Sequence, residues 1–354
     1  MVIKKDRVHQ ALNPLFEAAA DSKYSVCVLP MDMAPCELPL WCTGRVKLIL
    51  VKVMYIYSHI AFAFRSIPVF RNQELVIVRE YLTVPLLLSW PFMFVFRRKL
   101  LFIVNHTIQF MHKSPVQRWA FWLLSKLGAR YVFLESSAGS ELALSNDVIN
   151  DCLVLPQPAQ SSDNQEKASG NCVSDDSMVV GIIGDFREEK GNWELLEYLF
   201  NVGRAGEVSW ELMIGTNDSA VQSWCLERNI MVMDTSSSSE YARAFNKCDI
   251  VILNYEMDSY FYRCSGIICD AISMGTAVLC PDYPILRHQI SAYGQIGEVF
   301  SELHEIPEKI RLMSSRSELY AVGFVTQISE RSVLGIQNKI DRFFKERRLL
   351  NGAE

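Results

Sequence analysis

Residues 260–282, YFYRCSGIICDAISMGTAVLCPD, carry the sequence pattern that decides the fold. The stretch predicts a loop, a helix, a tight turn and a buried strand in succession. The small residues Ser265 and Gly266 stand where the helix would begin, Gly275 marks its end, and the apolar run 277–280 forms the strand. Because the first N–H groups of a helix have no partner within it, this start predicts an anion-binding turn.

This arrangement resembles the donor-nucleotide site of GT-B glycosyltransferases, especially the retaining family 4 enzymes. Their pattern has two spaced Glu residues, of which the second precedes an Ala-rich helix, a Gly and a Pro-Val strand. Asp270 stands at the second Glu, where the resemblance implies a contact with the ribose. Tyr262 stands at the first Glu, so the chain departs from the pattern there. The pair Ser265-Gly266 looks like the version found in related groups, which implies that its backbone binds phosphate.

A second motif, GDFREEKG, follows the predicted strand 178–183. It resembles the G-R-x-x-x-x-K-G segment of the same enzymes, in which Arg and Lys hold the donor diphosphate. Lys190 matches that Lys, Asp185 takes the place of that Arg, and Arg187 is expected to substitute for it. Two cations at a helix start neutralise a departing phosphate. The resemblance therefore implies catalytic roles for Lys190 and Arg187, with Gly184 and Asp185 beside the donor.

Further candidates follow the ends of other predicted strands. The strand 99–105 delivers His106, and ligands of α/β sheets bind outside the carboxyl ends of strands. His106 resembles the His of the GT-B N-domain that faces the donor sugar, although a lone His is more often structural. We expect Tyr255, Tyr260 and Tyr262 to line the cleft with hydroxyl groups or a base-stacking face.

The length of 354 residues suits two domains. We expect an α/β protein of the GT-B class, with two facing Rossmann-like domains and a cleft between them. Residues 1–158 would form an N-terminal acceptor domain, and the polar, Ser-rich residues 159–177 a linker. Residues 178–327 would form the donor domain, and residues 328–354 a terminal basic helix that crosses back towards the first domain.

The charge is divided unevenly along the chain. Residues 1–158 hold 17 Lys and Arg against 11 Asp and Glu, whereas the remainder holds 18 against 29, for a net charge of -5. A basic first half favours contact with an anionic surface, and two domains with different surfaces are the plain alternative.

Two apolar segments in the basic half bear on membrane contact. Residues 45–64 predict a core or membrane-lying helix, because Lys52 would be costly in a span. In residues 82–96, Trp90, Phe92, Met93 and Phe96 lie beside three cations, which is typical of an interfacial anchor. A buried helix between two strands explains the second segment equally well.

Composition limits the remaining possibilities. The 10 cysteines include no C-x-x-C pair, and the start of the chain lacks a signal-peptide pattern, so we expect a reducing, cytoplasmic location. No G-x-G-x-x-G, P-loop or D-x-D motif is present, which argues against a dehydrogenase, a P-loop NTPase and a metal-dependent transferase.

The resemblance implies a retaining hexosyltransferase that needs no metal or other cofactor. It would move a sugar from a nucleotide-sugar donor to a glycan or lipid-linked acceptor in cell-surface polysaccharide or glycolipid biosynthesis. The expected partners are these two substrates and the anionic inner face of a membrane, but no nucleic acid. One alternative is an inactive relative that binds a partner, suggested by Tyr262 and Asp185. The other is a nucleotide-sugar epimerase.

Overall fold

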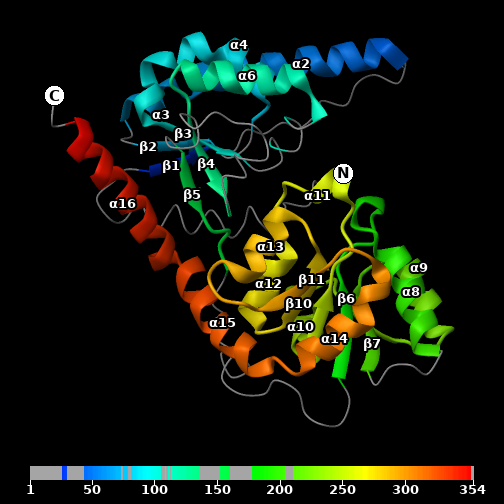
Figure 1. Ribbon diagram of the computed structural model, residues 1–354. Coiled ribbons are helices and arrows are strands. Elements are labelled where there is room, and N and C mark those ends of the chain that lie inside the picture. Colours follow the sequence, from blue (N-terminus) through cyan, green and yellow to red (C-terminus); the bar gives the residue numbers. More distant parts are fainter. Residues whose placement is uncertain are drawn as a thin grey trace. The chain divides into compact units, whose positions relative to one another are not determined.

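The computed structural model describes residues 26–29, 44–72, 75–78, 81–104, 108, 111, 113–135, 152–159, 178–204 and 210–351. The chain divides into two compact units (Figure 1). The first consists of Met1–Leu155 and Lys339–Glu354, and the second of Pro156–Asn338.

The first unit contains a parallel sheet whose described strands lie in sequence order: β1 (Val26–Leu29), β2 (Leu75–Val78), β3 (Leu100–Val104), β4 (Arg130–Leu134) and β5 (Leu153–Leu155). The connections contain α2 (Gly44–Arg65), α3 (Ile67–Asn72), α4 (Thr83–Met93), the 3-10 helix η1 (Phe94–Lys99) and α6 (Pro115–Lys126). Because parallel connections are right-handed, strands that follow one another in order place their helices on one face. Figure 1 shows α2, α4 and α6 together on that face.

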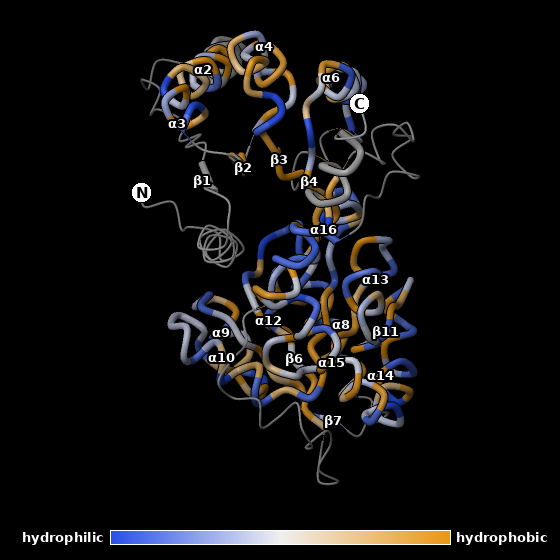
Figure 2. Tube along the Cα trace, turned by 90° about the vertical axis from the view of Figure 1, so that its left-hand side faces the viewer, coloured by the Kyte–Doolittle hydropathy of each residue, from blue (hydrophilic) through white to orange (hydrophobic). Residues whose placement is uncertain are grey.

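Aromatic side chains join this helical layer to its sheet. Trp90 of α4 packs against Phe102 of β3, with ring centroids 5.9 Å apart. Phe121 of α6 stacks on Tyr131 of β4 at 4.2 Å. All four side chains are almost fully buried. The hydropathy view shows β3 and most of α4 as apolar (Figure 2).

The second unit has a six-stranded parallel sheet in the order β11-β10-β9-β6-β7-β8. Its strands are β6 (Met178–Ile183), β7 (Trp210–Thr216), β8 (Met231–Asp234), β9 (Ile250–Ile252), β10 (Ala277–Pro281) and β11 (Gly297–Phe300). This is the doubly wound order, which reverses between β6 and β9. Chain connections therefore leave β6 and β9 in opposite directions, and the reversal opens a place for a ligand at their carboxyl ends.

The helices of the second unit alternate with these strands. They are η2 (Glu188–Lys190), α8 (Asn192–Arg204), α9 (Ser219–Leu226), α10 (Ser238–Lys247), α11 (Met257–Tyr260), α12 (Gly266–Met274), α13 (Pro284–Ser291), η3 (Leu303–Glu305), α14 (Ile306–Ser314) and α15 (Ser317–Arg331). The last helix, α16 (Val333–Asn351), begins in this unit and ends in the first. No helix among the residues searched has the length and apolar character needed to cross a bilayer.

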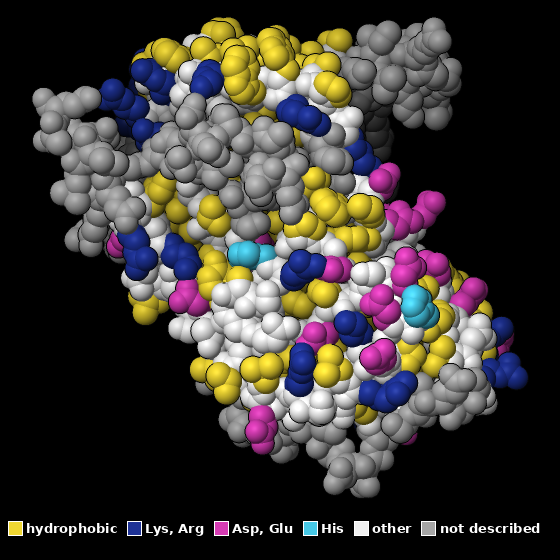
Figure 3. All heavy atoms as spheres, in the orientation of Figure 1, with side chains coloured by type: hydrophobic (Ala, Val, Ile, Leu, Met, Phe, Trp, Pro, Cys, Tyr) yellow, Lys and Arg dark blue, Asp and Glu magenta, His cyan; other side chains and the backbone are white. Residues whose placement is uncertain are grey.

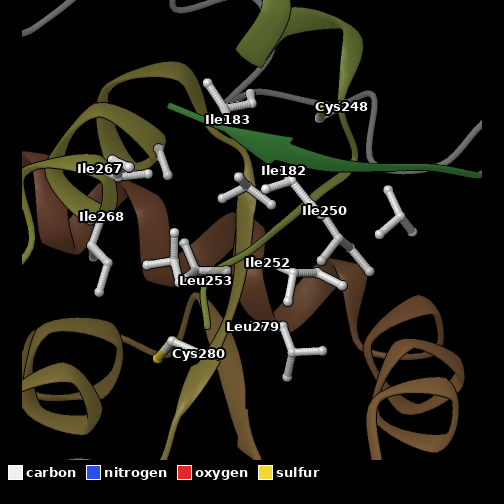
Figure 4. Close-up of a cluster of buried hydrophobic side chains, with 14 of the residues drawn as sticks. Ile182, Ile183, Cys248, Ile250, Ile252, Leu253, Ile267, Ile268, Leu279 and Cys280 are labelled. Atoms are coloured by element: carbon white, nitrogen blue, oxygen red, sulfur yellow. The ribbon is translucent and has the colours of Figure 1, made fainter. Parts of the chain in front are cut away.

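The stretch 260–282 folds as predicted. Ser265 caps the start of α12, Gly275 ends the helix with a left-handed φ of 67°, and β10 follows directly. Ile267 and Ile268 reach from α12 into the apolar centre of the sheet, where they join Ile182, Ile252 and Leu279 of the central strands (Figure 4). This burial fixes the start of α12 against the end of β6.

The predicted membrane anchor in residues 82–96 is half wrong. Trp90 and Met93 are buried in the core, at 2% and 0% exposure, because they lie on the side of α4 that faces the sheet. Phe92 is exposed and Phe96 half-buried. The composition of residues 82–96 does not show which apolar side chains are exposed, because that depends on which side of α4 faces the sheet.

Two predicted boundaries also shift. Residues 328–331 belong to α15, because Ser332 is extended and its hydroxyl accepts a hydrogen bond from the Gly335 N–H at 3.0 Å, which starts α16. Residues 156–158 belong to the second unit rather than the first. The reason is that Gln157 hydrogen-bonds to two side chains of that unit, Gln289 and Arg331.

Candidate functional site

The candidate site lies where β6 and β9 end, at the point where the strand order reverses. The loop that follows β6 is hydrogen-bonded to two residues of the segment that follows β9, Asn254 and Glu256. Asn254 donates a hydrogen bond to the Gly191 carbonyl at 3.0 Å, and Glu256 N–H donates to the Glu189 carbonyl at 3.1 Å. Gly191 has φ of 56°, and a Cβ there would lie 2.2 Å from the Asn254 carbonyl oxygen, so only glycine fits.

Lys190 is the central residue of this loop. Its side chain is 7% exposed, and its ammonium makes no hydrogen bond or ion pair within the described part of the chain. A Cβ built on Gly184 would lie 3.4 Å from Lys190 Nζ and 3.1 Å from Ile267 Cδ1, so the ammonium lies beside the first turn of α12. Burial lowers the pKa of Lys190, and the nearby Arg187 and Arg263 lower it further, although the Asp185 carboxylate opposes them.

Two arginines surround this ammonium. Arg187, half-exposed, lies 3.7 Å from an Asp185 oxygen and 3.3 Å from a Glu189 oxygen. Asp185 is an exposed carboxylate and cannot supply the positive charge of the family Arg, and the substitution of Arg187 for that Arg stays a prediction. Arg263, half-buried, holds its guanidinium 4.8 Å from the centre of the Tyr260 ring. Arg263 was not predicted from the sequence, even though a cation just before a helix start is a usable signal for an anion site.

The start of α12 offers fewer backbone donors than the sequence suggested. The Ser265 N–H donates to Gln289 Oε1 at 2.7 Å, and its hydroxyl accepts from Ile268 N–H and pairs with the Tyr255 hydroxyl. Ser265 is 1% exposed, so its backbone does not provide the predicted phosphate contact. The N–H groups of Gly266 and Ile267 belong to the first turn, where no carbonyl within the helix can accept them.

The three predicted cleft tyrosines are core residues. Tyr255, Tyr260 and Tyr262 are 3%, 4% and 5% exposed. Tyr255 stacks on Tyr260 with ring centroids 3.9 Å apart, and burial raises the pKa of Tyr255 far above its usual value. A tyrosine after a strand end has the same local sequence whether its ring points outward or under the loop, so the sequence did not reveal this burial, and donor contacts of these residues stay a prediction. Here they support the segment that carries Arg263.

Asp270 lies on α12 facing α10. The Tyr241 hydroxyl donates a hydrogen bond to Asp270 Oδ2 at 2.7 Å, and the carboxylate is half-buried. A hydroxyl donor holds the carboxylate in a fixed orientation. The role in ribose binding that the sequence suggested stays a prediction.

A buried network of polar side chains hydrogen-bonds to the start of α12 through Gln289. Gln289 also donates to the Gln157 side chain and the Ser265 carbonyl. Arg331, fully buried, donates to Gln327 Oε1 at 2.7 Å, to the Gln157 carbonyl at 2.8 Å and to the Gln289 carbonyl at 3.2 Å. The network joins the end of α15 to the start of α12 through groups that the sequence pattern did not reveal.

Several further expectations find no structural test. His106 lies outside the described residues, as do most of the predicted linker residues 159–177. Among the residues that the structure describes, no group of three or more His, Cys, Asp or Glu side chains is placed to hold a metal ion. The described residues do place three cations near one another: Arg187 and Arg263 lie close enough to Lys190 to lower its pKa, and Lys190 lies beside the start of α12.

Comparison with known proteins identifies the fold. No protein-family model and no curated protein matches the sequence. HepE from Anabaena, solved in complex with UDP, has a TM-score of 0.64 at 11% identity, with 97% of each chain covered. The lipopolysaccharide outer core galactosyltransferase WaaB has a TM-score of 0.64 at 12% identity, with 97% of this chain and 96% of that chain covered.

A third similar structure is sucrose-phosphate synthase from Thermosynechococcus elongatus, with a TM-score of 0.52 at 13% identity. It covers 90% of this chain, and 82% of its own chain is matched. At such identities the likeness establishes the fold alone. The chain has the fold of the GT-B glycosyltransferases, as the stretch 260–282 predicted.

Proposed function

We propose that this chain transfers a sugar from a nucleotide-sugar donor, and that the ends of β6 and β9 hold the donor diphosphate. The observation that carries the proposal is the Lys190 ammonium, 7% exposed and without an ion pair in the described structure, beside the start of α12. A buried cation is costly where no carboxylate lies within ion-pair distance. A diphosphate would supply the missing negative charge. HepE, of the same fold, was solved with UDP and with UDP-glucose, which makes UDP the first candidate.

The cations would act on the bond that breaks. As the anomeric carbon separates from the diphosphate oxygen, the electron pair leaves with the diphosphate. The acceptor oxygen forms the new bond and passes its proton to the departing diphosphate. Lys190 and Arg263 would stabilise the growing negative charge, with Arg187 at the exposed side. Asp270, oriented by Tyr241, would accept a hydrogen bond from the ribose. His106 is proposed, from the resemblance alone, to contact the sugar.

Finer features of the proposal rest on the resemblance of residues 260–282 to the retaining family 4 enzymes. They are retention of the anomeric configuration, a hexose as the transferred sugar, independence from metal, and a glycan or lipid-linked acceptor in surface polysaccharide or glycolipid synthesis. Cations in the places of Lys190 and Arg263 can neutralise a leaving diphosphate without a metal ion.

One observation favours a second candidate, a protein that binds the nucleotide sugar without transferring the sugar. Tyr262, at the position of the first Glu of the family pattern, is 5% exposed and packs edge-on against Phe261 at 4.7 Å. A buried phenol cannot replace a carboxylate that would face a sugar.

The first experiment is a thermal-shift series with UDP, GDP, ADP, TDP and CDP without added metal, on the native protein and on Lys190→Met. Methionine fills the buried space without the charge. One nucleotide should raise the melting temperature of the native protein, because a ligand of the folded state must stabilise it. The shift should vanish in Lys190→Met and persist in the exposed control Lys247→Met.

The outcome separates the two candidates. A nucleotide-induced rise in melting temperature, together with sugar release from the matching nucleotide sugar, supports the transferase. Proton NMR of the reaction then identifies which anomer is released first, and this tests retention. A shift without turnover across a broad acceptor set supports the binding protein. Equal shifts in the native protein and Lys190→Met would refute the proposed diphosphate site.

A further inference from the structure

Exposed apolar side chains gather on the outside of the helical layer in the first unit. The large hydrophobic residues among them are strongly exposed, reaching 70% for Tyr57, 78% for Val95 and 56% for Trp119. We call this surface the aromatic face, and it consists of Val53, Tyr57, Phe64, Leu88, Phe92, Phe94, Val95, Val116, Trp119 and Trp122. A space-filling view shows hydrophobic side chains crowded over α2 and α4, with Lys and Arg beside them (Figure 3). Large exposed apolar patches mark interaction sites.

The topology explains why these side chains are outside. Each helix has a separate inner set that packs on the sheet, such as Phe121 and Leu124 in α6. The outer residues Val116, Trp119 and Trp122 recur at helical spacing on the opposite side of α6. Neighbouring helices also meet at the surface: α4 packs against both α2 and α6, and Phe64 contacts Phe92 with ring centroids 4.6 Å apart. The face is thus shared by α2, α4, α6 and the 3-10 helix η1, which carries Phe94 and Val95.

The charges of the same helices are of one sign. α2, α3, α4, η1 and α6 contain no Asp or Glu, and their ten cations are Arg45, Lys47, Lys52, Arg65, Arg71, Arg97, Arg98, Lys99, Arg118 and Lys126. The helices of the second unit do contain acidic residues, and a single helix, α8, already carries two, Glu194 and Glu197. The cations identify the occupant, because two copies of this face would place like charges together, whereas an anionic surface complements them.

We propose that the aromatic face docks on the surface of an anionic lipid bilayer. Tryptophan, tyrosine and phenylalanine suit the boundary between headgroups and acyl chains, where one end of the side chain is apolar and the other wet. Arginine and lysine beside them are attracted to anionic headgroups. The helices lie along the bilayer surface. Lipid binding by the aromatic face does not depend on the proposed sugar transfer. If both hold, the aromatic face would bring the transferase to a lipid-linked acceptor.

The test uses the full chain and sedimentation with vesicles of phosphatidylcholine, with and without phosphatidylglycerol. The native protein should bind the anionic vesicles, bind the neutral ones weakly, and lose affinity as salt rises. The double variant Trp119→Gln/Trp122→Gln should lose about tenfold in affinity for anionic vesicles. The matched control is Val322→Gln/Val325→Gln on α15, where both residues are more than 60% exposed.

Each contrary result has a definite meaning. Native protein that ignores anionic vesicles, or a tryptophan variant that binds like native, would overturn the proposal. A native dimer that the tryptophan variant disrupts, measured by light scattering without lipid, would assign the face to a second copy instead. The UDP thermal shift should be the same in the tryptophan variant and the native protein, so failure of the donor site and failure of the aromatic face are distinguishable.

Discussion

The two units use the same alternation of parallel strands and helices, but they differ in strand order. In the first, the described strands β1 to β5 follow the sequence, and α2, α4 and α6 lie on one face. In the second, the order reverses between β6 and β9, and the loops there hold Lys190 at the start of α12. The comparison teaches that a reversal of strand order creates a place for a polar site at the carboxyl ends of central strands, whereas sequential order gathers the helices on one face of the sheet.

The units also differ in how they hold their polar groups. The described helices of the first unit carry exposed cations such as Arg65, Arg98 and Arg118. The second unit buries an arginine and three glutamines in one hydrogen-bonded network. Such a network is stable only when every member is satisfied. The second unit should therefore be the more sensitive to single polar substitutions.

The largest expected effect comes from Arg331→Met. The change leaves the carbonyls of Gln157 and Gln289 and the side chain of Gln327 without their buried donors. We expect a loss of about 3–5 kcal/mol in the free energy of unfolding. Chemical denaturation measures the loss, and hydrogen exchange should place it in β6, β9 and β10 while β3 and β4 keep their protection. Arg243→Met on exposed α10 is the control, and equal losses in both units would contradict the comparison.

A smaller effect is expected from the glycine that fastens the Lys190 loop. Gly191→Ala adds a methyl group 2.2 Å from the Asn254 carbonyl at a φ of 56°, so it should cost about 2–3 kcal/mol and abolish the nucleotide shift. Gly203→Ala on α8 meets nothing within 4 Å, and should instead raise stability by about 0.5–1 kcal/mol. Urea denaturation of the pair checks both signs. If Gly191→Ala kept native stability and nucleotide binding, the loop would not be fastened as described.

The smallest effect concerns the pH dependence of stability. Burial holds the pKa of Lys190 below its ordinary 10.5, so between these two pKa values the unfolded chain binds more protons than the folded one. The free energy of unfolding should gain a rising contribution as pH increases through that window. Lys190→Met should lack this contribution and be about 1–2 kcal/mol more stable than native at neutral pH. Denaturation from about pH 7 to about pH 10 tests this, and parallel profiles would exclude a costly buried ammonium.

Much of the fold could be predicted from local pattern. The apolar runs of β3 and β6 were placed within a residue or two, and α12 with β10 was placed from its small-residue start and glycine end. These signals are local, because strand length, caps and helix periodicity depend on neighbouring residues. The likeness of the whole chain to GT-B structures confirms the class that this pattern predicted.

The candidate site was predicted only in part. Lys190 and Gly184 lie together at the start of α12 as the motif suggested, but the tyrosines and the Ser265 N–H turned inward. Arg263 and Gln289 were missed. Whether a side chain faces a ligand or a core depends on what packs above it, and residues such as Gln289 lie far from the site in sequence.

The sequence by itself determined the order of strands and helices, the glycines that permit the loop and helix ends, and the absence of acidic residues from α2, α3, α4, η1 and α6. Only the tertiary structure decided that Trp90 is buried and Trp119 exposed, that Lys190 lies almost closed from solvent beside α12, and that Gln157 belongs to the second unit. The reason is physical: propensity and caps act between neighbours, whereas burial and hydrogen-bond partners are set by segments that meet only when the sheets assemble.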